Sequence, residues 1–176
     1  MNLSGSGLNI SISKNKIYNQ CNKSCRQDIR YGITAGLTVK RIDCISTFLS
    51  FYEATFDHQN IHLDNLTQAT VKNICIALNK DKNLLMFETF TKDCKLVSIN
   101  VFSTDVKQAY FLFGANDPKF RDSFLGTTCL WRSLNLFSDM GIKEVDLEGI
   151  NIPERGYFKL SFGRSIVPYY RASFLS

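Results

Sequence analysis

Hydrophobic and polar positions along the chain follow helical periods in some segments and strand-like patterns in others. The clearest helical stripe comes directly after Asp43, which we expect to cap the helix. Its apolar positions are three or four residues apart: Ile45, Phe48, Leu49, Tyr52 and Phe56. The same periodicity predicts further helices from Asn22 to a stop at Gly36, around 71–78, over 126–140 with a stop at Gly141, and near 155–162.

Three β-rich segments, 84–90, 96–102 and 109–113, are separated by short polar turns. These turns are too short for a crossover, so the segments are predicted to form an antiparallel meander. A strand at 144–147 is reached across the helix at 126–140 and is therefore expected to run parallel to the strand ending at Phe113. Short strands are expected at 8–12, 37–39 and 166–170. This order of elements predicts a mixed α+β domain.

The totals fit one globular domain, with 176 residues, 44% hydrophobic and 21% charged. We expect 1–21 to be a basic N-terminal arm or strand and 22–176 to be a single domain. No apolar run reaches the length of a membrane span, and the N-terminus lacks the pattern of a signal peptide. The expected location is the cytoplasm.

Cysteine and histidine spacing gives little support for a metal site. Cys44, Cys75 and Cys129 lie among apolar residues on predicted helices and are expected to be buried thiols. Cys21 and Cys25 could form half of a metal site, but no second Cys or His pair completes it. His58 and His62 are four residues apart in a segment rich in loop residues, so a surface loop is expected. We expect no metal.

The net charge of +5 is concentrated in two segments. Residues 1–41 contain seven basic residues against one acidic residue, and 155–171 contains four basic residues and no acid. Two interpretations stay open. The segments are either solvated surface or a contact for an anion such as phosphate, diphosphate or RNA.

A loop followed by a helix start, at 119–128, is the first candidate binding feature. It contains Arg121, Gly126 and Thr127, and the N–H groups at a helix N-terminus attract anions. The alternative is an ordinary capped helix.

A second feature is the string Gly149-Ile150-Asn151, followed by Phe158-Lys159-x-x-Phe162-Gly163 and then Val167-Pro168-Tyr169-Tyr170. It resembles the C-terminal half of the Fem-type (FemAB-like) N-acyltransferases, which have the GNAT fold. Upstream, 110–115 followed by Asp117-Pro118, and Arg26-x-x-x-Arg30 before Gly36, are similar to the same family. The resemblance covers roughly residues 22–171.

The resemblance implies a GNAT sheet, mostly antiparallel, with a V-shaped split between two central parallel strands and helices on both faces. The implied activity is transfer of an acyl or aminoacyl group from an activated thioester or ester to a primary amine. The acceptor would be a sugar or a cell-envelope precursor. Backbone N–H groups would hold the acyl carbonyl in the split, and Lys159 would stabilise the oxyanion.

The resemblance and the residue chemistry together assign three groups of candidate residues, each beside a plainer interpretation. Lys159 is otherwise an exposed side chain on a short helix, and the tyrosines are otherwise core or rim aromatics. Asp146 and Glu148 could include a base, or Asp146 hydrogen-bonds the nearby loop while Glu148 is exposed. The catalytic candidates are Lys159, Tyr110 and Tyr170; those for the donor are Phe111, Phe113, Arg121, Gly126, Thr127, Asn151 and Phe158; those for the acceptor are Arg26, Arg30, Arg164 and Tyr169.

The donor and the partners stay open at this stage. Arg121 is followed by 122–126 with a single glycine at its end, which departs from the diphosphate loop of coenzyme A-binding relatives. Acyl-coenzyme A is therefore one expected co-substrate, with acyl-carrier protein or aminoacyl-tRNA as alternatives, and no tightly bound cofactor is expected. Because the family usually has two GNAT halves, this chain would either pair with a second copy (a homodimer) or with another GNAT half, or its basic N-terminal arm would replace the missing half. The alternative function is a non-catalytic GNAT-like module that binds RNA or a carrier protein.

Overall fold

The computed structural model describes residues 3–11, 13–58, 60–120, 123–149, 153–163 and 165–169. For 3–6, 123, 153–155 and 165–169 it describes the backbone alone.

A seven-stranded sheet in the order β2-β3-β4-β5-β6-β1-β7 forms the centre of the molecule. The pair β5–β6 is parallel and the other neighbours are antiparallel. The strands are β1 (Leu3–Asn9), β2 (Thr38–Ile42), β3 (Leu84–Phe90), β4 (Leu96–Thr104), β5 (Gln108–Asn116), β6 (Glu144–Asp146) and β7 (Ser165–Tyr169). The predicted meander and the parallel fourth strand are confirmed, and so is the α+β fold class.

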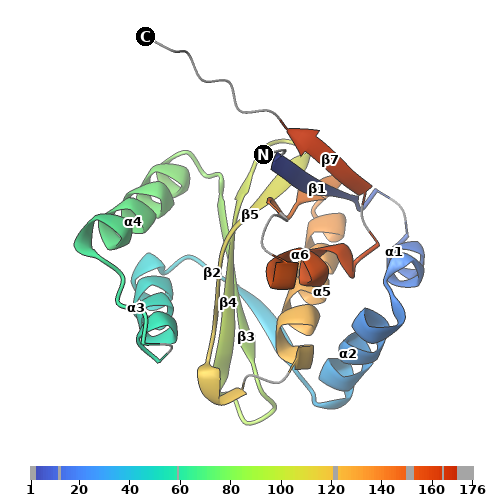
Figure 1. Ribbon diagram of the computed structural model, residues 1–176, viewed down its shortest axis with the longest axis horizontal. Coiled ribbons are helices and arrows are strands. Elements are labelled where there is room, and N and C mark those ends of the chain that lie inside the picture. Colours follow the sequence, from blue (N-terminus) through green and yellow to red (C-terminus); the bar gives the residue numbers. More distant parts are fainter. Residues whose placement is uncertain are drawn as a thin grey trace.

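Helices cover both faces of this sheet, with α3 and α4 on one side and α2 and α5 on the other (Figure 1). The helices are α1 (Lys14–Gln20), α2 (Lys23–Thr34), α3 (Ile45–Asp57), α4 (Asn65–Lys80), α5 (Ser123–Asp139) and α6 (Pro153–Leu160), with a 3-10 turn at Pro118–Phe120. In the described ranges, no helix is both long enough and apolar enough to cross a lipid bilayer.

The helix ends follow the predicted signals in most cases. Asn22 caps α2 by accepting a hydrogen bond from the N–H of Cys25. Gly36 and Gly141 have φ of 73° and 82°, the left-handed conformation that ends α2 and α5 as expected. The predicted cap of α3 is wrong: Cys44 occupies the N-cap position, and the helix begins one residue later than a cap at Asp43 requires.

Two further predictions differ from the structure. The predicted loop at 114–118 begins too early, because β5 stays paired with β4 through Asn116. The helix α1 was not predicted; its sequence is largely polar and it buries a single residue, Ile17.

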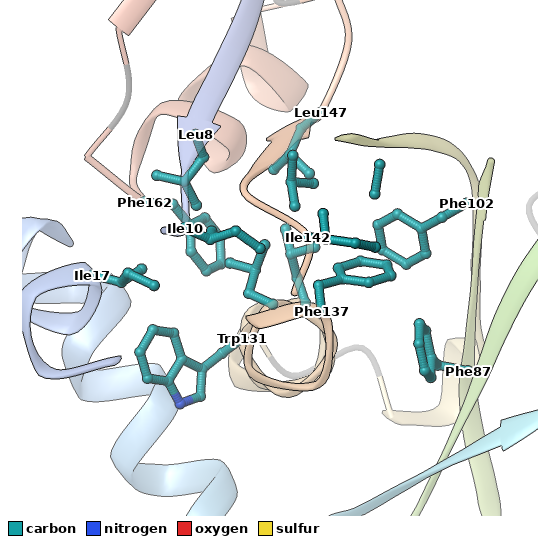
Figure 2. Packing of buried hydrophobic residues seen from close by; sticks show 14 of the residues in the cluster. Leu8, Ile10, Ile17, Phe87, Phe102, Trp131, Phe137, Ile142, Leu147 and Phe162 are labelled. Carbon is teal, nitrogen blue, oxygen red and sulfur yellow. The ribbon is translucent and has the colours of Figure 1, made fainter. Parts of the chain in front are cut away.

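The main core lies between the sheet and the pair α2 and α5 (Figure 2). Phe137 on α5 is fully buried and makes edge contacts with Phe87 and Phe102 from β3 and β4, with ring centroids 5.4 and 4.7 Å apart. A second core lies under α3 and α4 around Phe48 and Val71. Such edge-to-face ring contacts are favourable, and together they fix α5 against the sheet.

The cysteines divide between buried and exposed positions. Cys75 and Cys129 are fully buried, as expected. The prediction that Cys44 is buried is wrong, because its N-cap position sets it before the buried face of α3, where it is exposed. Hydrogen bonds from Ser46 and Thr47 lower the pKa of Cys44 to about 7.

The first strand of the chain lies inside the sheet, between β6 and β7. It begins before the predicted strand at 8–12. Leu8 at its end and Ile10 and Ile17 after it are part of the main core and are nearly inaccessible to solvent. The described part of 1–21 thus contributes a strand and a helix to the body that contains the other strands. The division of the chain at residue 21 stays a prediction.

Candidate active site

The sheet divides where β5 and β6 stop pairing. Their parallel register joins Gln108–Tyr110 to Glu144–Asp146, whereas β5 continues to Asn116. Beyond Tyr110, the side of β5 that faces β6 has no strand partner within the described residues. The carbonyl oxygen of Asn116 accepts a hydrogen bond from Oγ1 of Thr55, while the other backbone groups at this side have no strand to pair with and could bind a ligand.

A β-bulge lies at the start of this unpaired stretch. Phe111 is opposite Phe102 of β4, but the next pair is Phe113 with Val101, so Leu112 is an extra residue. Residues two apart on a regular strand share a face, yet Phe111 packs against the main core and Phe113 against the core under α3. The bulge thus turns the strand at the split and disrupts the hydrogen-bond ladder there.

A cavity of about 420 Å³ opens at the split. Its walls come from α3, β5, the segment after β6, and α6. It is lined by Tyr52, Phe56, Phe111, Leu112, Phe113, Gly114, Asn116, Glu148, Gly149, Phe158 and Lys159. Five of these eleven residues are aromatic, and Lys159 and Glu148 bring one positive and one negative charge.

Lys159 is half-buried in the last turn of α6. Its Nζ donates a hydrogen bond to the carbonyl oxygen of Gly149 at 2.9 Å, which holds the ammonium group at the segment after β6. The neighbouring Phe158 makes an edge contact with Phe162, with centroids 5.8 Å apart. The same ring lies beside Gly126 of α5, where an added Cβ would be 3.8 Å from it. These contacts fix α6 across the split.

Glu148 follows β6 in a left-handed conformation with φ of 65°. Its N–H donates to Oδ1 of Asp146 at 2.6 Å, so the expected contact between Asp146 and the loop is present. The side chain of Glu148 is exposed at the mouth of the cavity. Partial shielding from water, followed by the nearby charge of Asp146, raises the pKa of Glu148, and Lys159 opposes this shift. The carboxylate is therefore more basic than an ordinary glutamate.

The structure brings four of the described candidates to the cavity: Phe111, Phe113, Phe158 and Lys159. Tyr110 is one residue before the split, and its hydroxyl donates to Oε1 of Gln108 at 3.0 Å. Burial, with the charges of Asp105 and Asp146, raises the pKa of Tyr110. Its side chain does not line the cavity.

Of the remaining described candidates, Gly126 lies on α5 beside Phe158 and does not line the cavity, and the others lie on or against α2. Thr127 is buried, and its hydroxyl donates to Oδ2 of Asp28 at 3.1 Å, which joins α5 to α2. Arg26 donates to the carbonyl oxygen of Cys21, and Arg30 is exposed on α2. Neither arginine reaches the split cavity.

Several candidates lie outside the described residues: Arg121, Asn151, Arg164 and Tyr170, together with the side chain of Tyr169. Their roles stay predictions.

Sequence reasoning missed the wall that α3 contributes. Tyr52 and Phe56 lie four residues apart on α3 with ring centroids 4.8 Å apart, and Tyr52 is 5.9 Å from the ring of Phe113. In the sequence both rings belong to the apolar stripe of an amphipathic helix, which indicates core packing. Only the neighbouring split shows that this end of the stripe faces a cavity.

The described residues contain no group of three or more His, Cys, Asp or Glu that could hold a metal ion. His62 and Asp57 approach each other to 3.3 Å on the exposed surface. Cys21 and Cys25 are both buried at the junction of α1 and α2. Their thiols interact, so the pKa of Cys21 is lowered and that of Cys25 is raised.

Comparison with known proteins gives one family and a set of similar folds. The acetyltransferase (GNAT) domain family matches residues 19–163. No curated protein sequence matches the chain. The structure of FemX is similar with a TM-score of 0.76 and 13% identity, over 93% of this chain and 59% of that one.

Two other solved structures are similar at lower scores. The C-terminal domain of a putative lysylphosphatidylglycerol synthetase from Agrobacterium fabrum has a TM-score of 0.64 and 12% identity, over 96% of this chain and 59% of that one. L-PGS from Bacillus licheniformis also has a TM-score of 0.64, at 7% identity, over 94% of this chain and 58% of that one. The chain thus spans less than two-thirds of the length of each of these three structures.

Proposed function

The chain belongs to the acetyltransferase (GNAT) domain family and has a Fem-like GNAT fold, and from this we propose that it is an N-acyltransferase. In this proposal an acyl or aminoacyl group moves from an activated thioester or ester to a primary amine. The observation that carries the proposal is the cavity at the split, where Lys159 and Glu148 line the same space as the bulged strand β5.

The reaction needs two kinds of help from the protein. The amine nitrogen attacks the acyl carbon, and the carbonyl electron pair moves to oxygen, giving a tetrahedral oxyanion. The oxyanion then collapses, the bond to the donor's sulfur or oxygen breaks, and an amide remains. Donors of hydrogen bonds must stabilise the oxyanion, and a base must take the proton that the amine loses.

The bulge and Lys159 supply the oxyanion donors in this proposal. Among the described residues, the backbone N–H groups of β5 beyond Tyr110 have no strand partner on the side of β6, and the bulge at Leu112 interrupts the ladder on the other side. Lys159 adds a positive charge whose position is fixed by Gly149. Fixed donors in a partly enclosed site stabilise a developing negative charge without reorganising during the reaction.

Glu148 is the proposed base. Its carboxylate lines the cavity mouth and its pKa is raised, so it accepts a proton more readily than an ordinary glutamate. The backbone at Glu148 is fixed by the hydrogen bond to Asp146. The sequence made Glu148 one of two candidates for a base, and its place in the cavity supports that role.

The aromatic wall of α3 and β5 is the proposed acceptor surface. Tyr52, Phe56 and Phe113 form a continuous set of rings, and rings of this kind bind apolar groups and cationic amines. The acceptor we propose is an amine on a sugar or a cell-envelope precursor. One similar structure is named as a putative lysylphosphatidylglycerol synthetase, so an aminoacyl donor remains a candidate beside acyl-coenzyme A and acyl-carrier protein.

A donor screen tests the proposal. The chain is incubated with acetyl-coenzyme A, an acetylated acyl-carrier protein or an aminoacyl-tRNA, each with a panel of primary amines. Release of thiol or of uncharged tRNA is followed, and amide products are identified by mass spectrometry. We expect amide formation with one donor class and its loss in Lys159→Met. No amide with any donor, together with salt-sensitive RNA or carrier-protein binding, would instead identify a non-catalytic binding module.

A further inference from the structure

A second groove lies between the outer face of α5 and the edge strand β2. Its volume is about 510 Å³, and it shares no lining residue with the cavity at the split. The segment 37–39 forms one wall, and Arg132 and Asn135 on α5 form the other. Lys14 and Asp139 line it as well, and they form an ion pair of 2.7 Å.

Two residues that line this groove each contain a buried polar atom without a hydrogen-bond partner in the described part of the chain: Nε of Arg132 and Oδ1 of Asn135. Arg132 and Asn135 are three residues apart on α5, so they lie on the same face of the helix. Leaving a buried polar atom unpaired is unfavourable, and native proteins pair nearly all of them. This face of α5 therefore has one unpaired donor, on Arg132, and one unpaired acceptor, on Asn135, which complementary groups of a ligand would satisfy.

The groove also contains a positive charge, on Arg132, that no acidic side chain of the described residues neutralises. Lys14 is neutralised by Asp139, but no acidic side chain among the described residues forms an ion pair with Arg132. An arginine fork binds a carboxylate through two parallel N–H groups, and Nε is one of the two in the side-on arrangement. The complementary group for Arg132 is therefore an anion with two coplanar oxygens.

The wall opposite α5 extends the groove. In the described residues β2 pairs with β3 along one edge only and is the last strand of the sheet on this side. The first residues of β2, together with Leu37 before it, line the groove, and the rest of the strand continues the same unpaired edge. An extended chain can pair with such an edge.

We propose that the α5–β2 groove binds a carboxylate that has an amide N–H beside it, the arrangement found in an N-acyl amino acid or in the C-terminal residue of a peptide. Arg132 donates Nε–H to a carboxylate oxygen, and Asn135 accepts the ligand's amide N–H at Oδ1. Both buried atoms are satisfied at once. This site is separate from the proposed acyl transfer and does not depend on it.

N-acetylglycine is the probe, and the Nε–Hε signal of Arg132 in a proton–nitrogen correlation spectrum is the readout. Acetate keeps the carboxylate without the amide, and N-acetylglycinamide keeps the amide without the carboxylate. We expect a saturable shift of the Arg132 signal, with affinity at least about tenfold higher for N-acetylglycine than for either fragment. Asn135→Leu, followed by the same signal, and Arg132→Lys, which lacks this signal and is therefore followed by isothermal titration calorimetry beside the wild type, should each weaken binding about tenfold. Arg41→Lys, a matched change on β2 outside the groove, should not.

A longer ligand distinguishes the two possible sources of the carboxylate and its neighbouring amide, a free N-acyl amino acid and the C-terminus of a peptide. The peptide acetyl-Thr-Val-Thr-Gly with a free C-terminus should bind more tightly than N-acetylglycine if the ligand is a peptide that pairs with β2, and equally tightly if it is a small acylamino acid. The amidated peptide should bind weakly in both cases. The proposal is overturned if millimolar N-acetylglycine leaves the Arg132 signal unmoved, if acetate binds equally well, or if binding survives both groove variants. None of these titrations uses an acyl donor, so their outcome is independent of the donor screen.

Discussion

Replacing Lys159 by Met removes the positive charge from the split cavity while keeping an unbranched, apolar side chain of similar length. In the proposed reaction this deletes one donor to the oxyanion. Removing one such donor from an enzyme costs about 2.7–4 kcal/mol, a factor of about 10²–10³ in kcat. We therefore expect kcat to fall by that factor, with a smaller change in KM, because the donor acts on charge that develops only in the transition state.

The effect of the same change on stability is expected to be much smaller. The variant loses the hydrogen bond from Nζ to the carbonyl oxygen of Gly149, at a half-buried position where water can replace it. This loss is worth about 1–2 kcal/mol, at the lower end of the range for a bond to a charged group, because the position is half-exposed to water. For a domain of this size the melting temperature should fall by a few degrees. The effect of Lys159→Met on kcat can therefore be distinguished from its effect on stability.

The assay is single-turnover amide formation with the donor found in the screen, at a temperature well below the melting transition. Lys143→Met is the matched control, because Lys143 is exposed on the loop before β6 and does not line the cavity. It should retain the wild-type rate. If Lys159→Met is folded and turns over within about threefold of wild type, the role of Lys159 in oxyanion stabilisation is refuted.

Three further predictions address the base, the core and the helix packing. Because the pKa of Glu148 is raised, kcat/KM should rise with pH as Glu148 deprotonates, at a pH above the range of an ordinary glutamate. Glu148→Gln should lose this pH dependence and lower the rate by about 10²–10⁴, and an unchanged pH profile would exclude Glu148 as the base. Phe137→Ala should lower the free energy of unfolding by about 3–5 kcal/mol in urea denaturation, because the ring is fully buried against Phe87 and Phe102. Met140 is half-exposed just after α5, so the control Met140→Ala should change this free energy by about 0.5 kcal/mol or less. Gly32→Ala should also destabilise the protein, by about 1–3 kcal/mol, despite the higher helix propensity of alanine, because the new Cβ would clash with the side chain of Thr128 on α5. A stabilised variant would show that α2 and α5 can move apart freely.

Elements with a strong local period were predictable from the sequence. The stripe of α3 and the meander β3–β5 depend on spacing that is visible along a few residues, and α2 and α5 end at glycines with positive φ. In contrast, α1 has one buried side chain, Ile17, and is held mainly by tertiary contacts that no local pattern contains.

The candidate site was predictable only in part. Lys159 and Phe158 came from a family resemblance, and both line the cavity. The bulge at Leu112 left no signal, because 111–113 is a continuous apolar run that fits a regular strand equally well. Tyr52 and Phe56 carried the pattern of core residues, since a helical stripe does not show where the sheet beneath it divides.

The position of β1 has a consequence for the order of folding. Leu3 pairs with Tyr169, so this ladder joins residues more than a hundred and sixty positions apart, and β1 also pairs with β6 beside the split. Closing so large a loop carries a high entropy cost and slows folding. During synthesis the meander and its helices can form early, whereas the β6–β1–β7 half of the sheet waits until residue 169 has left the ribosome. The cavity at the split is therefore expected to be among the last features of the molecule to form.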